Sequence, residues 1–498
     1  MASINQMLKN VAKDTVYYTA AKVVAGLMGI LSVKLFTSLF APDVFGDYSI
    51  VSTTVNMLLM IVFGWLFHSA IRFSQEYQAV EEKKKFYSTL FLCSAAVSVL
   101  TVFIGGFLLF FLQNSIDKGL TILILGGILF LGTQSNALIL FNLLRAERMS
   151  RLYSLLTIGY SVLKLAVIYV MARALGFGAD SIFWSGALLD VAVITAMAYK
   201  LQIWKYFDKD SFAPQLLRRF FSYGSPLIGV SITTWILSAS DKYVIKIYRT
   251  SAEVGIYSIS YSLVAAGFTL VNTSLMLGLY PIILKTWKEH GKKGTEELMG
   301  KILRYYLIMT IPAFVGLSVL ALPALTVLSS PDYISGYTVI PWVALGLLFQ
   351  GLTEYVTKVW ELQENTKTIF YLMIVAAIVN ILLNIVMVPY YGFYAAAITT
   401  AASYLIYLIL ALGLSHKIFA WKISLKSMGR IAIASFMMAG VLQVFLQWIH
   451  RSTLHLILGI LFGVVVYFIA LILVGELKDE IVQIQGVLKR RRNEYEDY

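Results

Sequence analysis

Long apolar runs follow one another along almost the whole chain, and short polar segments separate them. A helix needs about 20 predominantly apolar residues to cross a bilayer, and by this measure the chain contains about fourteen runs of spanning length. They cover residues 15–40, 44–70, 86–113, 119–143, 151–175, 179–200, 223–249, 253–281, 300–329, 334–361, 367–388, 392–415, 427–449 and 453–475. The pattern predicts an all-α polytopic membrane protein.

The distribution of charge agrees with this prediction. Only 13% of the 498 residues are charged, against about 25% in an ordinary soluble protein. The net charge of +13 comes from basic residues that cluster in alternate loops, such as Lys83–Lys85 and Lys489–Arg492. This is the arrangement that the positive-inside rule describes. We therefore expect both termini to be cytoplasmic, no cleaved signal and no nucleic-acid partner.

Two short motifs occur twice at nearly equal spacing. Phe45–Ile50 (FGDYSI) recurs as Val254–Ile259 (VGIYSI), and Gly176–Ala179 (GFGA) recurs as Gly392–Ala395 (GFYA). The copies flank helices in corresponding positions, which indicates a duplicated six-helix unit. An even number of helices gives both copies the same orientation, so we expect two lobes related as parallel repeats around a central cavity. The last two helices are extra.

This organisation predicts five segments. They are an N-terminal lobe (1–200), a cytoplasmic amphipathic linker (201–222), a C-terminal lobe (223–416), an extra helix pair (417–475) and a cytoplasmic charged tail (476–498). In the linker, aromatic and leucine side chains alternate with Arg218 and Arg219. Such a segment is suited to lie in the membrane interface.

Basic side chains lie within or at the edge of the first two spans. Lys22 falls about 12 Å into the first span, Lys34 falls near its outer end, and Arg72 ends the second. A charge inside a span is costly and marks a functional candidate by default. The alternative for both lysines is that they snorkel toward the headgroups.

The fifth span carries a polar stripe that ends in a charge. Tyr153, Thr157, Tyr160, Ser161 and Lys164 share one helix face. Lys164 falls near the midplane of the bilayer.

Asp190 in the next, antiparallel span falls at a similar depth to Lys164. We predict a Lys164–Asp190 ion pair facing the cavity. A purely structural pair is the alternative, since intramembrane charges usually pair with one another.

The second half carries different groups at depth. Asn380 and Asn384 lie on one face of the eleventh span, where they either meet substrate or hold helices together. Near the outer end of the seventh span, Lys242 and Arg249 share a face with Lys246 and form either a basic mouth or a set of interface anchors.

Two further carboxylates are candidates for coupling to an ion gradient. Asp241 lies in the seventh span beside Lys242. Glu354 lies in the tenth span, four residues before Lys358, a spacing that supports a local ion pair as the alternative role.

Signals for catalysis, cofactors and metals are absent. The segment Gly291–Thr295 lacks the first glycine of a P-loop, and the five histidines form no metal-binding pattern. A single cysteine, Cys93, excludes an intramolecular disulfide framework. We expect neither an enzyme nor a bound cofactor.

The chain resembles the polysaccharide-transporter (Wzx-like, O-antigen flippase) family along nearly its whole length. The similarity is carried by short motifs, namely Phe45–Ser49, Ile71–Phe73, Tyr223–Leu227, Ser240–Tyr243, and Asn380 with Asn384 leading to Pro389–Gly392. This family belongs to the multidrug/oligosaccharidyl-lipid/polysaccharide exporter superfamily. The resemblance implies a two-lobed, V-shaped transporter of the bacterial cytoplasmic (inner) membrane.

The resemblance also implies a function. The chain would flip undecaprenyl-pyrophosphate-linked oligosaccharide by alternating access, for O-antigen, capsule or exopolysaccharide assembly. Membrane lipid is an expected partner, and a polysaccharide polymerase and a chain-length regulator are candidate partners. In the related lipid II flippases an added helix pair contributes a groove for the lipid tail, so the last two spans are expected to do likewise.

These expectations assign roles to the candidate residues. Lys22, Lys164 and Arg72 would meet phosphate or acidic sugar, with Tyr160 for stacking and Asn380 and Asn384 for neutral hydroxyls. One alternative is an ion-coupled multidrug exporter, which would favour an acidic first-lobe cavity. A membrane-bound polymerase or ligase is the other alternative, and it would need a long outer loop, whereas every predicted outer loop is short.

Overall fold

The computed structural model describes residues 4–77, 79–421, 424–447, 452–478, 480–482 and 485. The described residues are helical, with no strand among them. They divide into two compact units. Unit 1 contains Met1–Leu270 and Met373–Thr400, and unit 2 contains Val271–Leu372 and Ala401–Tyr498.

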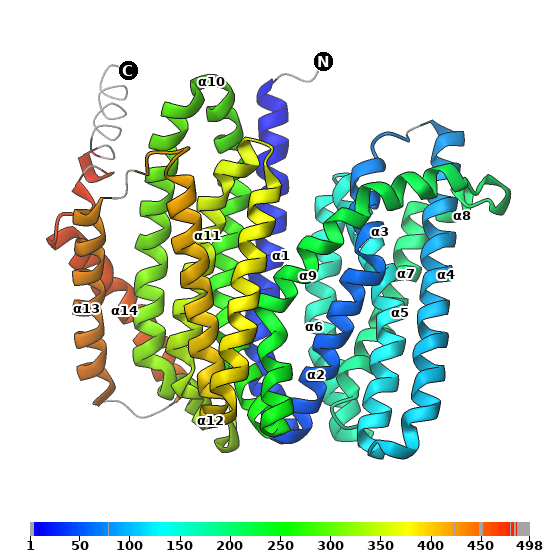
Figure 1. The fold of residues 1–498 in the computed structure, drawn as a ribbon, viewed down its shortest axis with the longest axis horizontal. Helices are drawn as coiled ribbons and strands as arrows, with labels where there is room; N and C mark the ends of the chain where they lie inside the picture. Colours follow the sequence, from blue (N-terminus) through cyan, green and yellow to red (C-terminus); the bar gives the residue numbers. More distant parts are fainter. Residues whose placement is uncertain are drawn as a thin grey trace, which may run out of the picture. The chain divides into compact units, whose positions relative to one another are not determined.

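Most helices of unit 1 come from the N-terminal half of the chain. They are α1 (Ile4–Leu39), α2 (Pro42–Leu58), the π-helical turn η1 (Leu59–Phe63), α3 (Gly64–Phe73), α4 (Val80–Leu112), η2 (Gln113–Ser115), α5 (Lys118–Ala146), α6 (Ser150–Ala174), α7 (Ser181–Leu201), α8 (Ile203–Tyr206), η3 (Lys209–Ser211) and α9 (Pro214–Tyr248). Within the unit, α5 packs against α4 and α7, and α1 packs along α6 (Figure 1).

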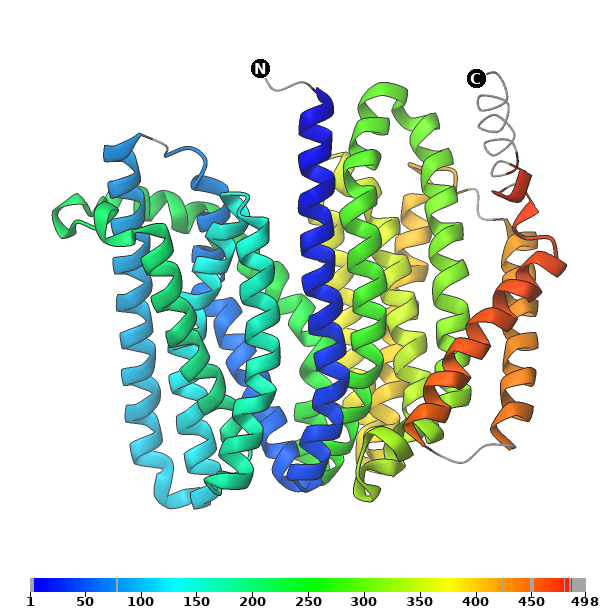
Figure 2. The same ribbon diagram turned by 180° about the vertical axis from the view of Figure 1, so that it is seen from behind.

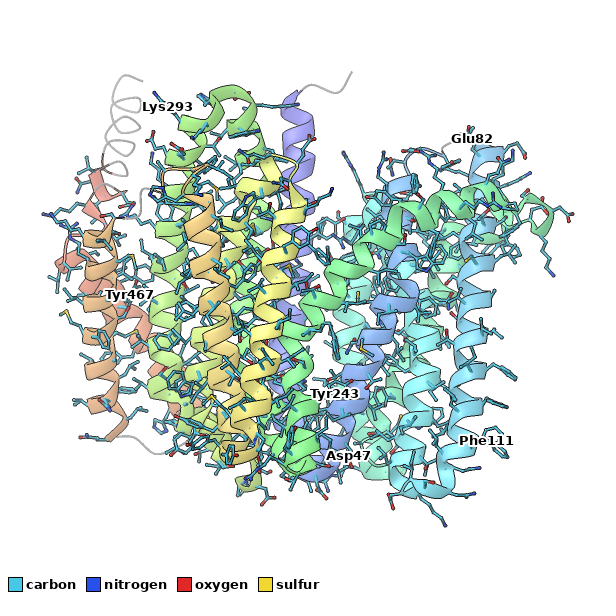
Figure 3. The ribbon with its side chains drawn as sticks, viewed as in Figure 1. Asp47, Glu82, Phe111, Tyr243, Lys293 and Tyr467 are labelled. Carbon is cyan, nitrogen blue, oxygen red and sulfur yellow. The ribbon has the colours of Figure 1, made fainter. Side chains whose placement is uncertain are left out.

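The remaining helices are α10 (Ser251–Leu328), η4 (Pro331–Thr338), α11 (Ile340–Leu362), α12 (Thr366–Ser415), α13 (Leu425–Gln447) and α14 (Thr453–Leu473). The first part of α10 and the central part of α12 belong to unit 1, and the rest belong to unit 2. In unit 2, α14 crosses α13 at a steep tilt (Figure 2). Tyr467 of α14, which Figure 3 labels, donates to the Ile308 carbonyl oxygen at 2.8 Å and ties the pair to α10.

Glycines at positive φ interrupt two of the long helices. Gly291 in α10 has φ 59° and ψ −154°, and Gly392 in α12 has φ 60° and ψ −146°, so each helix consists of two consecutive helices around a break. Gly176, the counterpart of Gly392 in the repeated motif, also has a positive φ of 73°. A residue with a Cβ rarely adopts this conformation, which explains glycine at both hairpins.

Eleven helices in the described part of the chain are long and apolar enough to cross a membrane, or twelve when η4 and α11, bent by 53°, count as one span. Two of the eleven are the interrupted helices α10 and α12. The chain is a multi-pass membrane protein, as predicted. The number of fourteen spans and the arrangement of the lobes remain predictions.

One predicted boundary is wrong. The seventh span was expected from residue 223, but α9 begins at Pro214 and runs without interruption to Tyr248. Proline is well tolerated in the first turn of a helix. Phe220 is fully buried and packs on Phe73 and Phe86 at ring distances of 5.6 and 5.7 Å. The second part of the predicted linker is therefore the first part of a spanning helix.

The repeated motif is also a contact between its two copies, within unit 1. Ser49 and Ser258, which are 209 residues apart, share a hydrogen bond of 2.6 Å. A Cβ added at Gly46 would lie 2.6 Å from the Ser251 carbonyl carbon, and one added at Gly255 would lie 2.9 Å from the Pro42 carbonyl carbon. The contact is reciprocal. Gly46 faces Ser251 and Gly255 faces Pro42, and Ser251 and Pro42 occupy equivalent positions in the two copies, four residues before each glycine. Reciprocity of this kind is the mark of a two-fold relation, so it supports the duplication.

Candidate functional site

A polar cavity of about 270 Å³ lies between α5 and α6 of unit 1. Its wall is made of Gln134, Leu138, Phe141, Asn142, Arg145, Tyr153, Thr157, Tyr160 and Ser161. We call it the α5–α6 pocket. Four of its lining residues, Tyr153, Thr157, Tyr160 and Ser161, come from the stripe that the sequence predicted.

Aromatic rings and cations share one part of the pocket. Tyr153 makes edge-on contacts with Tyr18 of α1 and Phe141 of α5, at centroid distances of 5.3 and 5.7 Å. Arg145 lines the pocket, and Lys22 of α1 is close enough to repel it electrostatically. Arg145 lies outside the expected span 119–143, whereas α5 extends to Ala146 and places it in the wall.

Lys164 lies beyond the far end of the polar stripe. Its amine is 5.1 Å from the centre of the Phe130 ring and 5.8 Å from the centre of the Tyr160 ring, so two aromatic faces hold the charge. Such contacts stabilise a cation more strongly where water is excluded. Among the described residues, no carboxylate lies within 4.0 Å of Lys22, Arg145 or Lys164.

The predicted ion pair between Lys164 and Asp190 is therefore wrong. Asp190 is fully buried on α7 and bonds other groups. It accepts from the Thr133 hydroxyl at 3.1 Å, and the Tyr160 hydroxyl, which donates to the Gln134 side-chain oxygen at 3.4 Å, lies beside it. The Gln134 amide satisfies all its neighbours when its nitrogen faces Asp190, and it then donates to both carboxylate oxygens at 3.2 Å. Hydroxyl and amide groups, rather than the Lys164 amine, donate hydrogen bonds to the Asp190 carboxylate.

Gln134 is a site residue that was not predicted from the sequence. It is the side chain through which the pocket touches Asp190, because it lines the pocket and bonds the carboxylate. An amide in the middle of an apolar span was the available signal, since polar side chains in spans usually face a helix partner or a cavity.

A second polar cluster surrounds Asp241 of α9, also in unit 1. Asp241 is 1% exposed. It accepts from the Tyr257 hydroxyl, from the Thr400 hydroxyl at 3.4 Å and from its neighbour's backbone N–H at 2.9 Å. The cluster is made of oxygen-bearing side chains around one carboxylate.

Asn380 and Asn384 belong to this Asp241 cluster. Asn380 donates to Thr400 at 3.2 Å, and Asn384 donates to Asn380 at 3.1 Å and accepts from the Thr399 hydroxyl at 2.7 Å. Both asparagines are buried, at 1% and 0% exposed. Their placement favours the alternative in which they hold α9 and α12 together.

The cations near the end of α9 all have partners. Lys242 donates to Ser49 at 3.3 Å. Lys246 pairs at 2.6 Å with Asp47, which Figure 3 labels. Arg249 pairs with Glu253 at 2.9 Å. Two carboxylates thus balance two of the three charges that were predicted to form a basic mouth or anchors.

The remaining predicted residues lie outside the α5–α6 pocket. Arg72 is half exposed at the end of α3 and pairs with Glu76 at 2.6 Å. Glu354 lies in unit 2, where it accepts from Asn272. Lys358 does not pair with Glu354, as its alternative role required, but with Glu361 at 2.7 Å. The predicted Glu354–Lys358 pair is therefore wrong, because Asn272 from another helix segment donates to the Glu354 carboxylate.

Comparison with known proteins identifies the family. Residues 11–287 match the sequence profile described as polysaccharide biosynthesis protein. This span covers more than half of the 498-residue chain. The chain belongs to the polysaccharide biosynthesis protein family. A second profile, MatE, matches residues 226–386 of this family member.

Curated relatives of this chain include two from Haloferax volcanii. One is the probable low-salt glycan biosynthesis flippase Agl15, 22% identical over 59% of this chain and 61% of its own length. The chain thus spans less than two thirds of Agl15. The other is the probable flippase AglR, 25% identical over 75% of this chain and 78% of its own length. Both relatives are named as probable flippases rather than as catalysts, in line with the prediction that the chain is not an enzyme.

Solved structures agree on the fold. The lipid II flippase MurJ in an inward closed conformation superposes with a TM-score of 0.73, covering 94% of this chain and all of that one at 17% identity. An inward-facing multidrug resistance MATE transporter of the MOP superfamily gives a TM-score of 0.60 over 82% of this chain at 14% identity. The chain therefore has the fold of the MOP superfamily transporters.

Proposed function

We propose that the chain flips a lipid-linked oligosaccharide across the membrane, and that the α5–α6 pocket binds its charged headgroup. The observation that carries this proposal is the pocket's chemistry. It combines Arg145 on the wall and Lys22 beside it, neither of which has a carboxylate within 4.0 Å among the described residues, with aromatic rings and amides. Phosphate attracts the cations, and sugar rings stack on aromatic faces. At about 270 Å³ the pocket is smaller than most drug-sized sites, so it suits the headgroup end of a glycan rather than the whole of it.

The substrate is most specifically an undecaprenyl-pyrophosphate-linked glycan for O-antigen, capsule or exopolysaccharide assembly. The sequence resemblance supports this choice. Agl15, a probable low-salt glycan biosynthesis flippase, and AglR, a probable flippase, support the broader class of glycan flippase. The protein would lie in a bacterial cytoplasmic membrane with both termini inside and work by alternating access. A polysaccharide polymerase would use its product.

An apolar groove on the extra helix pair would take the lipid tail. The groove has a volume of about 430 Å³ and is lined by Gly440, Val441, Val444, Phe445 and Phe462 of α13 and α14. Its lining is apolar throughout, as a polyprenyl chain requires. Gly440 leaves room in the groove, because no atom lies within 4 Å of a Cβ added there.

Energy for transport would come from an ion that binds the Asp241 cluster. A buried carboxylate in a membrane is costly unless a cation or a proton accompanies it. The surrounding side chains include the hydroxyl oxygens of Tyr257 and Thr400, and hard cations such as sodium prefer oxygen ligands. We propose that sodium or a proton binds there.

A multidrug exporter is the second candidate, because the MatE profile matches residues 226–386. Such an exporter handles cations. The α5–α6 pocket carries Arg145 on its wall and Lys22 beside it, and like charges repel a cationic drug. The charge of the pocket therefore favours the flippase.

The test is transport of a fluorescent undecaprenyl-pyrophosphate oligosaccharide in proteoliposomes, with a second polyprenyl carrier in parallel. We expect Lys164→Ala and Lys22→Ala to lose flipping at equal levels of folded protein. Lys34→Ala is the matched control, because Lys34 is an exposed lysine on the same helix as Lys22. If the wild type moved a cationic dye but none of the lipid-linked glycans, the exporter would replace the flippase.

A further inference from the structure

The side chain of Gln134 stands between a buried carboxylate and the α5–α6 pocket. It lines the pocket, and its amide reaches both oxygens of Asp190 at 3.2 Å. Asp190 is fully buried, so its own atoms do not reach the pocket surface. A change in the charge of Asp190 can reach a ligand by contact only through a neighbour such as Gln134 or Tyr160.

The amide of Gln134 has an NH₂ donor on one side and a C=O acceptor on the other. The protonation state of Asp190 determines which of the two it bonds. An ionised carboxylate only accepts hydrogen bonds, so it takes the NH₂ of Gln134. A protonated carboxyl group carries an O–H donor, which bonds the amide oxygen instead. Rotation of the amide by a half-turn exchanges these two sides and changes the volume of the side chain little. The wall of the pocket then presents an NH₂ donor in place of a C=O acceptor.

We propose that Gln134 is a positioning residue that converts protonation of Asp190 into a change of ligand preference in the α5–α6 pocket. This inference rests on the proposed function, because it assumes an anionic headgroup in that pocket. Phosphate oxygens only accept hydrogen bonds. The pocket therefore binds the headgroup tightly when Asp190 is protonated and releases it when Asp190 is ionised.

The groups around the carboxylate are consistent with this switch. Tyr160 and Lys164 of α6 face it, Thr133 of α5 bonds it, and Tyr48 of α2 interacts electrostatically with Tyr160. Lys164 is held by ring faces rather than by the carboxylate. No direct ion pair therefore fixes the charge of Asp190.

The test uses the full-length purified protein and farnesyl pyrophosphate as the probe, with the dissociation constant measured from pH 5 to pH 8. We expect the wild type to bind about tenfold more tightly at the low end, the size of one hydrogen bond to a charged group. Asp190→Asn should keep only the pH dependence that comes from ionisation of the pyrophosphate itself, which loses its last proton at about pH 6. Gln134→Leu should bind about tenfold more weakly than the wild type at low pH and lose most of the pH dependence.

Asn142→Leu is the matched control, because Asn142 is an amide of α5 that lines the same pocket two helical turns away. We expect it to weaken binding at every pH and to keep the wild-type pH profile. If Gln134→Leu kept the wild-type amplitude, or if Asn142→Leu lost it, the assignment to Gln134 would be overturned.

A second measurement needs no ligand and so separates this inference from the proposed function. Infrared difference spectra between low and high pH contain the carboxylic-acid band of Asp190, which Asp190→Asn removes. The band should shift in Gln134→Leu, because its hydrogen-bond partner is gone, and should stay in place in Asn142→Leu. An unshifted band would refute the switch even in a protein that flips glycans. A shifted band without any pyrophosphate binding would instead refute the headgroup site.

Discussion

The contact between the two copies of the repeated motif offers a sharp test of the fold. Gly46 and Gly255 face backbone carbonyl groups, and an added Cβ would lie 2.6 Å from one carbonyl carbon and 2.9 Å from the other. Two carbon atoms pack best at about 3.5–4.0 Å. An alanine at either position must push the two helices apart by about 1 Å, because the obstacle is backbone and cannot rotate away.

We expect Gly46→Ala and Gly255→Ala each to destabilise the protein by about 1–3 kcal/mol, the usual cost of overpacking. The assay is the thermal unfolding midpoint of the detergent-purified protein. Gly26→Ala is the control, because nothing lies within 4 Å of a Cβ added at Gly26. Alanine is the better helix former by up to about 1 kcal/mol, so the control should be neutral or more stable. Midpoints that shift equally in all three variants would refute the close approach of the two copies.

Three other predictions concern buried and charged contacts. Arg304→Met should destabilise the protein by about 3 kcal/mol, because Glu476 and Glu480 of unit 2 lose their ion pairs with Arg304. Lys301→Met breaks only an exposed pair and should cost under about 1 kcal/mol in the same melting assay. The hydrogen bond from Arg304 holds the pKa of Glu480 below its usual range. That contribution to stability is present at neutral pH and is lost as the pH falls through the lowered pKa, so Glu480→Gln should flatten the acid end of the melting curve against pH. Asn384→Leu should cost about 1–3 kcal/mol, because it removes a buried amide that accepts from the Thr399 hydroxyl at 2.7 Å and donates to Asn380 at 3.1 Å. An unchanged midpoint would contradict the buried network.

Hydrophobic pattern predicted the helices well because a spanning helix has a fixed length and an apolar surface. The fifth span was expected over 151–175, and α6 covers Ser150–Ala174. The start of α9 was missed because the amphipathic segment before the span is helical too, and Phe220 packs into the same unit. An apolar stretch marks where the lipid begins, whereas the helix continues as long as its inner face has a partner.

The pairing of charges could not be predicted from sequence for a different reason. Position along a helix gives the depth of a group but not the neighbours that other helices bring to it. Lys164 and Asp190 were matched by depth, yet Phe130 and Gln134 of a third helix fill the space that a direct pair would need. In the same way, Lys358 has two glutamates within reach, and contacts from outside its helix decide between them.

The two polar clusters of unit 1 differ in one physical respect that fits a division of labour. Asp190 touches a cavity through Gln134, whereas Asp241 is enclosed by Tyr257 and Thr400. A large headgroup needs an open wall, and a small ion needs only a few oxygens. Under the proposed function, the first repeat would therefore recognise the substrate and the second would bind the ion. A duplicated unit can separate these tasks because each copy keeps the helices while its buried polar residues change independently.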